Sequence, residues 1–447
     1  MGPRAISPLT SRGSQLSKVR VAFLGAGSYV FGPTLISQCV VENRIPSLSW
    51  RLFDPDFESV AVMASIGEKL ASTEGIDVDF SAFDDPDKAL AGADFVVCSA
   101  AVEMNRRFQV DRAIIEKVYP RHLITEFGGV YGIASSLRQM AMISDIARRI
   151  RRQCPDAWLL DISNPLPRVC QIAHLEGVKT VGFCSVSISG FGRLHEIFGG
   201  PPTSYPFHEA QDRFTVQMGG TNHLSWLIEL HDRATGEDLM DELRARLQKR
   251  KDHVRSKCEA YGRTTGFMLM SGDDHVQDFL PLDGYEHSLA SVSHGSDEER
   301  MARLRLLSDV AKGRREISEL KPKPSWERPS DFIQAMMDGS DASFMSLNLV
   351  NEGQIPNLPP EVFVETAVSI KGRSLLPRMT TLPESVLPYS RLAVEINRSL
   401  ANAFRSKALR YVNEAVEMDP TIQDKEKGRN AVRDCLSASE DVIGCYA

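Results

Sequence analysis

The stretch "KVRVAFLGAGSYVFG", residues 18–32, decides the fold expected for this chain. It is an apolar run that leads directly into Gly25 and Gly27, as a buried strand followed by a tight turn does. In a dinucleotide-binding fold the first glycine permits the turn, and the second lets the backbone approach a pyrophosphate at the start of the next helix. Val30 replaces the third glycine of that fingerprint, so the motif alone is weak. We expect cofactor contacts from Gly25, Gly27, Ser28 and Tyr29.

A second strand ends in an acid that strengthens this interpretation. The stretch "SWRLFDPD", residues 49–56, reaches Asp54 at the end of its apolar run. A carboxylate at this place hydrogen-bonds the adenosine ribose hydroxyls and would repel a 2′-phosphate. We therefore expect NAD rather than NADP. The alternative is a glycine turn followed by a solvated acid at a strand end.

Three further apolar runs, residues 94–101, 157–165 and 179–185, predict more strands of the same sheet. Between the first two of them, residues 135–156 repeat apolar side chains at three- and four-residue steps, which is typical of an amphipathic helix. Strands that alternate with helices indicate an α/β protein with a Rossmann-like, doubly wound parallel sheet. Ligands of such sheets bind beyond the carboxyl ends of the strands.

The second half of the chain has a different pattern. Residues 213–232 alternate as antiparallel strands do, and charged helical stretches follow at 241–262 and 297–320. The last clear helix is expected over residues 390–416. The division that these patterns predict is a loose tail (1–17), a Rossmann-like NAD-binding domain (18–195) and a C-terminal α+β domain for substrate, metal and oligomerisation (196–447).

Composition excludes several classes of function. The chain has 447 residues, 42% hydrophobic and 25% charged, with a net charge of −7. This is an ordinary globular profile, and its negative charge disfavours nucleic-acid binding. No apolar run reaches the roughly 18 residues of a membrane span, and the polar N-terminus lacks a signal sequence. We expect a cytoplasmic protein whose eight cysteines are reduced thiols.

Polar residues follow the fourth and fifth expected strands and occur in the antiparallel region. They are Asn164 in "DISNPLP", Cys184 in "GFCSVS", and Asn222 and His223 in "GGTNHLSW". A Cys thiolate and a neutral His are suitable ligands for a divalent transition metal. A buried small thiol and a satisfied core histidine are the alternatives, and two ligands alone are a weak signal.

Taken in order, these stretches resemble glycoside hydrolase family 4, the NAD-dependent glycosidases. The resemblance runs from "VAFLGAGSYVFGPTLI" and "FDPD" through "DISNPLPRV", "GFCSVS" and "GGTNHLSW". It ends with "EGQIPNLPPEVFVETAVSIKGRSLLP", residues 352–377, which is similar to the C-terminal signature of the family. The resemblance implies that Cys184 and His223 bind a divalent metal, usually Mn²⁺.

The resemblance also implies an unusual route of hydrolysis. Most glycosidases use two carboxylates, and this NAD-dependent family is an exception. NAD oxidises sugar carbon 3, the resulting ketone acidifies the proton on carbon 2, a base removes that proton, and the aglycone leaves from carbon 1. Water then adds, and the hydride returns. The bound metal stabilises the charge that develops on the sugar oxygens.

The base is expected in "GFMLMSGDDHVQDFLP", residues 266–281. Family members use a Tyr or an Asp in this region, and the window has no Tyr. Asp273 is therefore the expected base and Asp274 the competitor, while His275 is expected to orient a carboxylate or contact substrate. The alternative is a polar loop with two solvated acids and a histidine.

One position departs from the family. The residue after the metal-binding Cys is His, Asp or Asn in familiar subgroups, but here it is Ser185, a poor general acid. Arginines that follow the third strand and lie elsewhere suit an anionic sugar such as a uronide, a sugar phosphate or a sulfoquinovoside. Solvated helix faces are the alternative for them. The expected substrate-binding residues are Glu103, Arg106, Arg138, Asn164, Asn222, Arg263 and His275, and Asn164 is also expected to contact the cofactor.

Two other functions remain open at this stage. A dehydrogenase of the lactate or malate type shares the architecture but would make net NADH. A nonenzymatic NAD-binding sensor would bind the cofactor without turnover. A small glycoside is the expected partner, with no nucleic acid or membrane, and the resemblance implies a homodimer or homotetramer.

Overall fold

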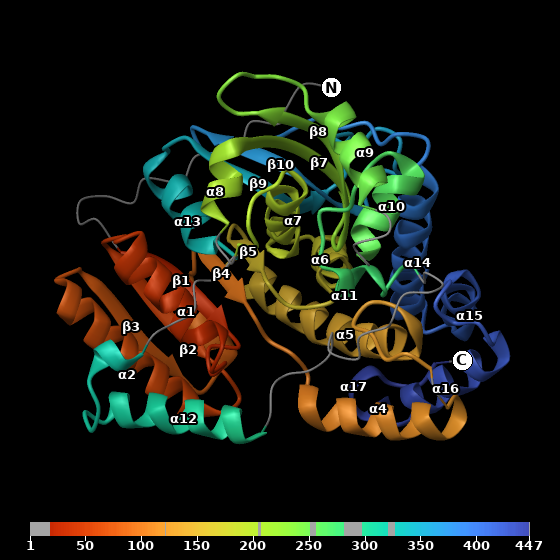
Figure 1. The fold of residues 1–447 in the computed structure, drawn as a ribbon. Coiled ribbons are helices and arrows are strands. Elements are labelled where there is room, and N and C mark those ends of the chain that lie inside the picture. Colours follow the sequence, from red (N-terminus) through yellow and green to blue (C-terminus); the bar gives the residue numbers. More distant parts are fainter. Residues whose placement is uncertain are drawn as a thin grey trace.

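The computed structural model describes residues 18–120, 122–203, 207–250, 256–280, 297–320 and 327–446. Their strands form one sheet in the order β3-β2-β1-β4-β5-β6-β9-β10-β7-β8, with β11 beside β10 (Figure 1). The sheet therefore joins the N-terminal and C-terminal parts of the chain.

The N-terminal part of the sheet is parallel and doubly wound. Its order, 3-2-1-4-5-6, reverses direction between β1 and β4, where dinucleotides bind in such folds. The predicted α/β class and Rossmann-like sheet are confirmed. The strands are β1 (Val19–Leu24), β2 (Leu48–Phe53), β3 (Val78–Phe83), β4 (Phe95–Cys98), β5 (Trp158–Asp161) and β6 (Lys179–Gly182).

The strand β3 was not predicted from the sequence. It lies at the edge of the sheet, and Asp79 and Ser81 of this strand are exposed. A strand with one solvated face is short of apolar residues, so its pattern is weaker than that of a strand buried on both faces.

Helices connect these strands. The expected helix at 135–156 is present as α5 (Gly129–Gln153), which begins earlier because Gly129–Ala134 are also buried. The π-helical turn η1 (Gln38–Glu42) extends α1. The other helices of this part are α1 (Phe31–Ser37), α2 (Phe57–Glu74), α3 (Pro86–Leu90), α4 (Met104–Val118), α6 (Leu166–Leu175), η2 (Val186–Ile188) and α7 (Ser189–Ile197).

The C-terminal part contains the expected antiparallel pair, β7 (Phe214–Thr221) and β8 (Leu224–Asp232). The other strands are β9 (Ala342–Val350), β10 (Phe363–Lys371) and β11 (Ser374–Pro377). The helices are α8 (His208–Arg213), α9 (Met240–Lys249), α10 (Lys257–Thr265), α11 (Asp273–Val276), α12 (Asp297–Ala311), η4 (Ile317–Glu319), α13 (Pro329–Asp338), α14 (Leu387–Ser406), α15 (Leu409–Met418), α16 (Lys425–Ser437) and α17 (Glu440–Ile443).

The single helix expected over residues 390–416 was wrong. Lys407 adopts a left-handed conformation, with φ 57°, and ends α14, so α15 starts as a separate helix. Two further helices, α16 and α17, then follow. The charged stretch 241–262 forms α9 and α10, with residues 251–255 outside the described part.

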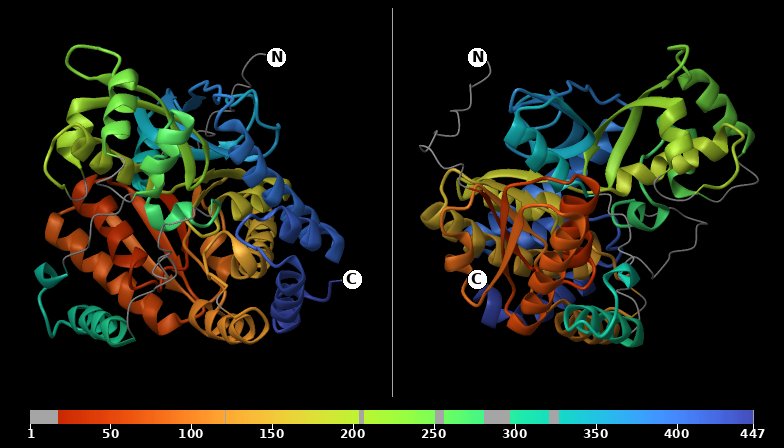
Figure 2. Two further views of the ribbon diagram at one scale, coloured as in Figure 1. Left: turned by 45° about the vertical axis from the view of Figure 1, so that its right-hand side comes forward. Right: turned by 90° about the vertical axis from the view of Figure 1, so that its left-hand side faces the viewer.

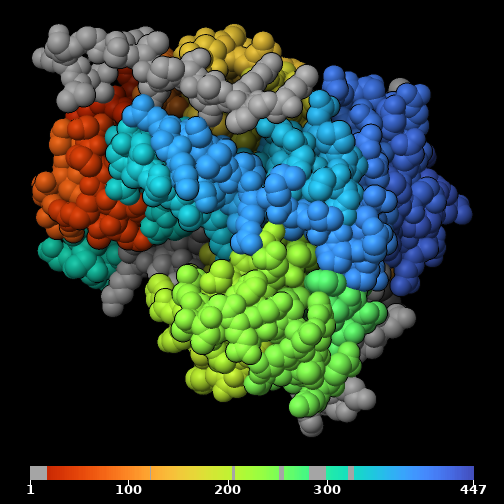
Figure 3. Space-filling view, turned by 90° about the horizontal axis from the view of Figure 1, so that it is seen from above, coloured from red at the N-terminus to blue at the C-terminus, as the bar shows by residue number. Residues whose placement is uncertain are grey.

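The two parts of the chain share their cores. Antiparallel pairing of Gly182 on β6 with Asn348 on β9 joins the two parts of the sheet. Helix α16 packs on α4 and α5, and α12 packs on α2. Residues of β7, β8, α9 and α10 form a lobe that projects from the remainder (Figures 2 and 3). The predicted boundary at residue 195 falls within α7, so the domain division stays a prediction, and the tail 1–17 lies outside the described residues.

None of the described helices combines the length and apolar character that crossing a bilayer requires.

Candidate active site

The turn after β1 brings Gly25 and Gly27 close to neighbouring strand ends. Gly25 has φ +83°, and a Cβ there would lie 2.8 Å from the backbone nitrogen of Ala100, which follows β4. A Cβ on Gly27 would lie 2.9 Å from Cγ of Asp54. A side chain at either position would collide with its neighbours, so both positions require glycine. Gly27 in addition lets the Asp54 carboxylate lie against the turn.

The Asp54 carboxylate lies where the sequence places it, directly after β2. Its Oδ1 accepts a hydrogen bond from the backbone of Asp56 at 3.1 Å. Burial raises the pKa of this carboxyl, and the backbone N–H groups of Asp56 and Gly27 oppose that shift. Of the other residues expected here, Ser28 accepts a hydrogen bond from the Phe31 N–H at 3.1 Å, and Tyr29 packs against the core beneath the turn.

The structure brings Cys184 and His223 together from segments 39 residues apart, with 3.5 Å between Sγ and Nε2. Cys184 follows β6, and His223 occupies the turn between β7 and β8 with φ +64°. Desolvation raises the pKa of the Cys184 thiol, and the carboxylates of Glu365 and Glu327 raise it further. Burial and the neighbouring His275 lower the pKa of His223, which leaves a neutral imidazole. A neutral imidazole is the form that binds metals.

One carboxylate near His223, that of Glu126, was not predicted from the sequence. Glu126, His223 and His275 each offer a donor atom, and these atoms lie within 4.8 Å of one another. Desolvation raises the pKa of Glu126 to about 7, Asn164 opposes the shift through a hydrogen bond, and Asp274 adds to it. Asn164 thus lies at the cluster, as expected of a residue at the end of β5.

The two acids of "GDDH" have different surroundings. Asp273 Oδ1 accepts hydrogen bonds from Ser256 Oγ at 2.9 Å, from the Cys258 N–H at 3.0 Å and from Arg193 at 3.3 Å. These contacts make Asp273 an anchor between α10 and α11. Asp274 faces the cluster instead, with Oδ2 4.0 Å from Nε2 of His275. Asp274 is therefore the acid that the structure brings to Glu126 and His275.

Two more carboxylates lie near Cys184 without having been predicted. Ser185 donates a hydrogen bond to Oε1 of Glu327 at 3.0 Å. Glu365 on β10 accepts hydrogen bonds from Ser187 at 2.9 Å and from Ser225 at 2.6 Å. Both acids come from segments more than a hundred residues away, and nothing in their local sequence indicates the site.

Buried amides surround the same place. Asn222 and Asn348 are fully buried. The Asn222 side chain interacts with the Cys184 thiol, whereas neither polar atom of the Asn348 amide has a hydrogen-bond partner among the described residues. Asn222 precedes His223, and Asn348 pairs with Gly182, two residues before Cys184. A buried amide without a partner is costly, so Asn348 could be satisfied by a polar ligand at this place.

The expected arginines are engaged elsewhere. Arg138 is 1% exposed and forms a buried ion pair with Asp111, between α4 and α5. Arg106 is on the surface of α4 and pairs with Glu103 at 2.9 Å. Arg263 lies on α10, where its carbonyl accepts a hydrogen bond from Gln248 at 3.1 Å. The side chains of Arg138 and Arg106 are thus held in ion pairs with Asp111 and Glu103.

Two family models cover most of this chain. The model "Family 4 glycosyl hydrolase" matches residues 20–199, and the model of the C-terminal domain of that family matches residues 218–422. The chain belongs to family 4 of the glycosyl hydrolases. It is therefore a glycosidase, as the sequence resemblance predicted, and the site at the ends of β5 and β6 lies in a family 4 enzyme.

Two relatives match this chain along nearly its whole length. The α-galactosidase of Bacillus subtilis (strain 168) is 24% identical over 440 residues, which cover 96% of this chain and 98% of that protein. The α-galacturonidase of Lachnoclostridium phytofermentans is 25% identical, over 95% of this chain and 97% of that protein. A 6-phospho-α-glucosidase from gut microorganisms, solved in complex with NAD and Mn²⁺, has a TM-score of 0.76 at 19% identity, over 96% and 100% of the two chains. This last similarity shows the shared fold.

Proposed function

We propose that this family 4 enzyme hydrolyses its glycoside by NAD-dependent transient oxidation at sugar carbon 3, deprotonation at carbon 2, elimination of the aglycone and addition of water. The observation that carries this proposal is the pair Cys184–His223, 3.5 Å apart beyond the end of β6. A glycosidase that used two carboxylates alone would not need a thiol and an imidazole at this edge of a dinucleotide-binding sheet.

The residues at the turn after β1 and at the end of β2 fit NAD. Gly25 and Gly27 leave room that a Cβ would fill, and Asp54 offers its carboxylate at the end of β2. The cofactor, when bound, supplies a reversible acceptor for the hydride of the sugar. Asp54 orients the ribose, and its negative charge disfavours a 2′-phosphate.

The donor set at Cys184 and His223 fits a divalent transition metal such as Mn²⁺. The side chain of Asn222, next to His223, interacts with the Cys184 thiol and so helps to place this ligand. The metal, when bound, supplies positive charge where negative charge develops on the sugar oxygens. Several similar solved structures contain NAD or manganese, which supports both assignments.

We assign deprotonation of carbon 2 to Asp274 and an anchoring role to Asp273. Asp274 is partly exposed, with 44% of its side chain accessible, and lies beside His275, whose imidazole can orient the carboxylate. Three donors already occupy Oδ1 of Asp273. A base must reach the proton it removes. The two side chains are similarly exposed, at 37% for Asp273 and 44% for Asp274, so the assignment rests on the three donors that hold Asp273 and on the place of Asp274 beside His275 and Glu126.

Neither the proposed base nor the metal ligands determine which sugar the enzyme hydrolyses. Relatives named α-galacturonidase and maltose-6′-phosphate glucosidase act on anionic sugars, and the α-galactosidase acts on a neutral one. The first substrates to test are therefore galacturonides, phosphorylated glucosides and galactosides.

Proton NMR in deuterated water tests the proposal. The full chain with NAD, Mn²⁺ and reductant is given α- and β-aryl glycosides of galactose, glucose, uronic acids, sugar phosphates and sulfoquinovose. Cleavage with deuterium at carbon 2 is expected. It should be lost on chelation and in Cys184→Ser, and retained in the exposed-cysteine control Cys445→Ser.

Other outcomes favour the alternatives. Net NADH without cleavage would make the protein a dehydrogenase of the lactate or malate type. Binding of NAD without turnover of any glycoside would favour a sensor. Cleavage without deuterium would exclude the elimination route.

A further inference from the structure

Three ligand-type side chains meet next to Cys184, from three distant segments. Glu126 precedes α5, His223 is in the turn between β7 and β8, and His275 is in α11. One donor atom from each lies within 4.8 Å of the other two, and the two imidazole centroids are 4.2 Å apart. Ligands about 2.1 Å from a common ion lie roughly 3–4.3 Å apart, so a small movement would close this set on a cation.

Both histidines of the cluster have one ring nitrogen without a hydrogen-bond partner among the described residues. His223 is 2% exposed, and its Nδ1 has no hydrogen-bond partner among the described residues. Nδ1 of His275 has none there either. Beside the two imidazoles, the groups that shift the pKa of Glu126 are the neutral Asn164 and the acidic Asp274, and neither is a Lys or an Arg. Two imidazoles and an uncompensated carboxylate are a donor set that divalent transition metals prefer.

We propose that Glu126 and His275 bind the same divalent cation as His223, so that the protein holds this ion before the substrate arrives. This inference rests on the proposed function for the presence of a cation, and the ligand set that it proposes is Glu126, His223 and His275. Glu126 and His275 are only partly buried, which leaves one side of the ion open to substrate oxygens.

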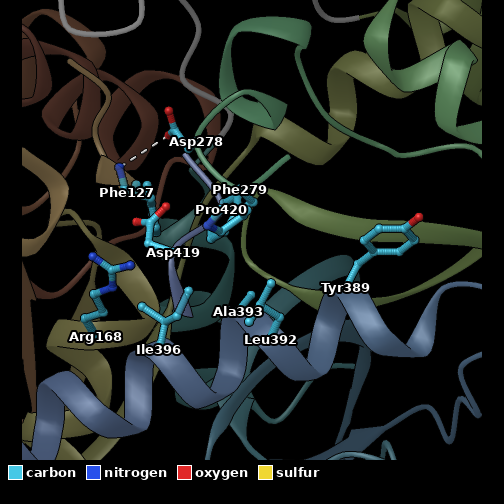
Figure 4. Close-up of a pocket in the computed structure, with 11 residues that line it drawn as sticks. Phe127, Arg168, Asp278, Phe279, Tyr389, Leu392, Ala393, Ile396, Asp419 and Pro420 are labelled. Carbon is cyan, nitrogen blue, oxygen red and sulfur yellow. Dashed lines mark hydrogen bonds between the residues drawn. The ribbon is translucent and has the colours of Figure 1, made fainter. Parts of the chain in front are cut away.

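The segment that carries Glu126 is fixed from both sides. The Phe127 N–H donates to Oδ2 of Asp278 at 3.4 Å (Figure 4). The Gly129 N–H donates to Oδ2 of Asp419 at 2.8 Å. The ring of Phe127 also packs on that of His223, with centroids 4.4 Å apart.

The same acid also holds the segment of His275. The Asp278 N–H donates to the carbonyl of His275 at 3.1 Å, so one residue connects both proposed ligands. Behind it lies a small cavity of about 10 Å³, lined also by Arg168 and Asp419 (Figure 4). Fixed ligands bind metals more tightly because little ordering is needed on binding.

Electron paramagnetic resonance of Mn²⁺ tests this proposal on the full chain, without NAD or substrate. The wild type should bind one ion, and Glu126→Gln and His275→Gln should each weaken binding by at least about tenfold. Matched controls are Glu395→Gln, a surface acid paired with Arg398, and His231→Gln on β8; neither should change the affinity. Circular dichroism verifies that each variant is folded.

Cobalt absorption gives a second readout that does not depend on activity. The visible spectrum of bound Co²⁺ should differ between wild type and Glu126→Asp, which retains a carboxylate in a shorter side chain. Wild-type affinity and spectra in Glu126→Gln and His275→Gln would overturn the proposal, as would a wild type that binds no Mn²⁺ until substrate is added. If Mn²⁺ binds as expected and no glycoside is cleaved, the proposed reaction fails while these ligands stand.

Discussion

The hydroxyl of Ser185 donates a hydrogen bond to Oε1 of Glu327 at 3.0 Å. Ser185 directly follows Cys184, and Glu327 lies two residues before α13. The hydroxyl of Ser185 is itself a poor general acid. Its hydrogen bond, however, holds the carboxyl group of Glu327 next to Cys184. The contact suggests how leaving-group protonation is achieved without an Asp or His at residue 185.

We predict that Glu327→Gln slows cleavage in proportion to the basicity of the leaving group. Alkyl glycosides need protonation, so their kcat should fall by about 10²–10⁴-fold, the usual size of a general-acid effect. Nitrophenyl glycosides leave without protonation and should lose much less. Steady-state kinetics on a series of aglycones measures this difference, with Ser185→Ala as the milder companion. Equal losses across the series would show that Glu327 is not the acid.

Gly128→Ala is expected to disrupt the support of Glu126. A Cβ at this position would lie 1.8 Å from the carbonyl oxygen of Asp278, which is backbone and cannot rotate away. The forced shift should lower the free energy of unfolding by about 1–3 kcal/mol and weaken Mn²⁺ binding. Urea denaturation and a metal titration measure both effects. Gly236→Ala is the control for metal affinity: its φ of +74° also strains an alanine, but no atom lies within 4 Å of the added Cβ, so it should lower stability without weakening Mn²⁺ binding. An unchanged metal affinity in Gly128→Ala would contradict the support role.

The free energy of unfolding should fall as the pH rises toward the raised pKa of Asp161. Burial raises the pKa of this carboxyl to about 7, although the Ser163 N–H donates to it at 2.9 Å. The folded state then binds more protons than the unfolded state between about pH 4 and pH 7, so the free energy of unfolding decreases across that window.

Asp161→Asn removes this dependence. At pH 8 the free energy of unfolding of the variant should exceed that of the wild type by about 4 kcal/mol at most, because one pKa unit corresponds to about 1.4 kcal/mol. Urea denaturation at pH 5 and pH 8 gives the slope. Asp241→Asn, whose side chain is 97% exposed, should leave the slope unchanged. A variant slope equal to that of the wild type would assign the effect to other groups.

Asp54→Asn should weaken NAD binding by about 10–100-fold, because hydrogen bonds to a charged group contribute about 1.5–3 kcal/mol. Binding of NADP should weaken less, since the repulsion of its 2′-phosphate is removed at the same time. Calorimetry with both cofactors checks the change in preference. If both affinities fall equally, Asp54 does not set the choice of cofactor.

The parallel sheet, its glycine turn and Asp54 could be predicted because each is encoded in a short contiguous pattern. A strand buried on both faces must be apolar throughout, and a tight turn needs glycine where the backbone approaches another strand. The edge strand β3 lacked such a pattern, and so did the break at Lys407 between α14 and α15. Local sequence therefore determined the N-terminal architecture and the segments from which Cys184 and His223 come.

The composition of the site was decided by tertiary structure. Glu126 is a single acid between Thr125 and Phe127, and only the approach of His223 and His275 gives it a chemical role. Arg138 looked available to an anionic sugar until the fold placed Asp111 against it in the core. Electrostatic interactions and metal coordination act over a few ångströms in space, whereas sequence patterns report only on neighbours along the chain. Which charges meet is therefore decided by packing.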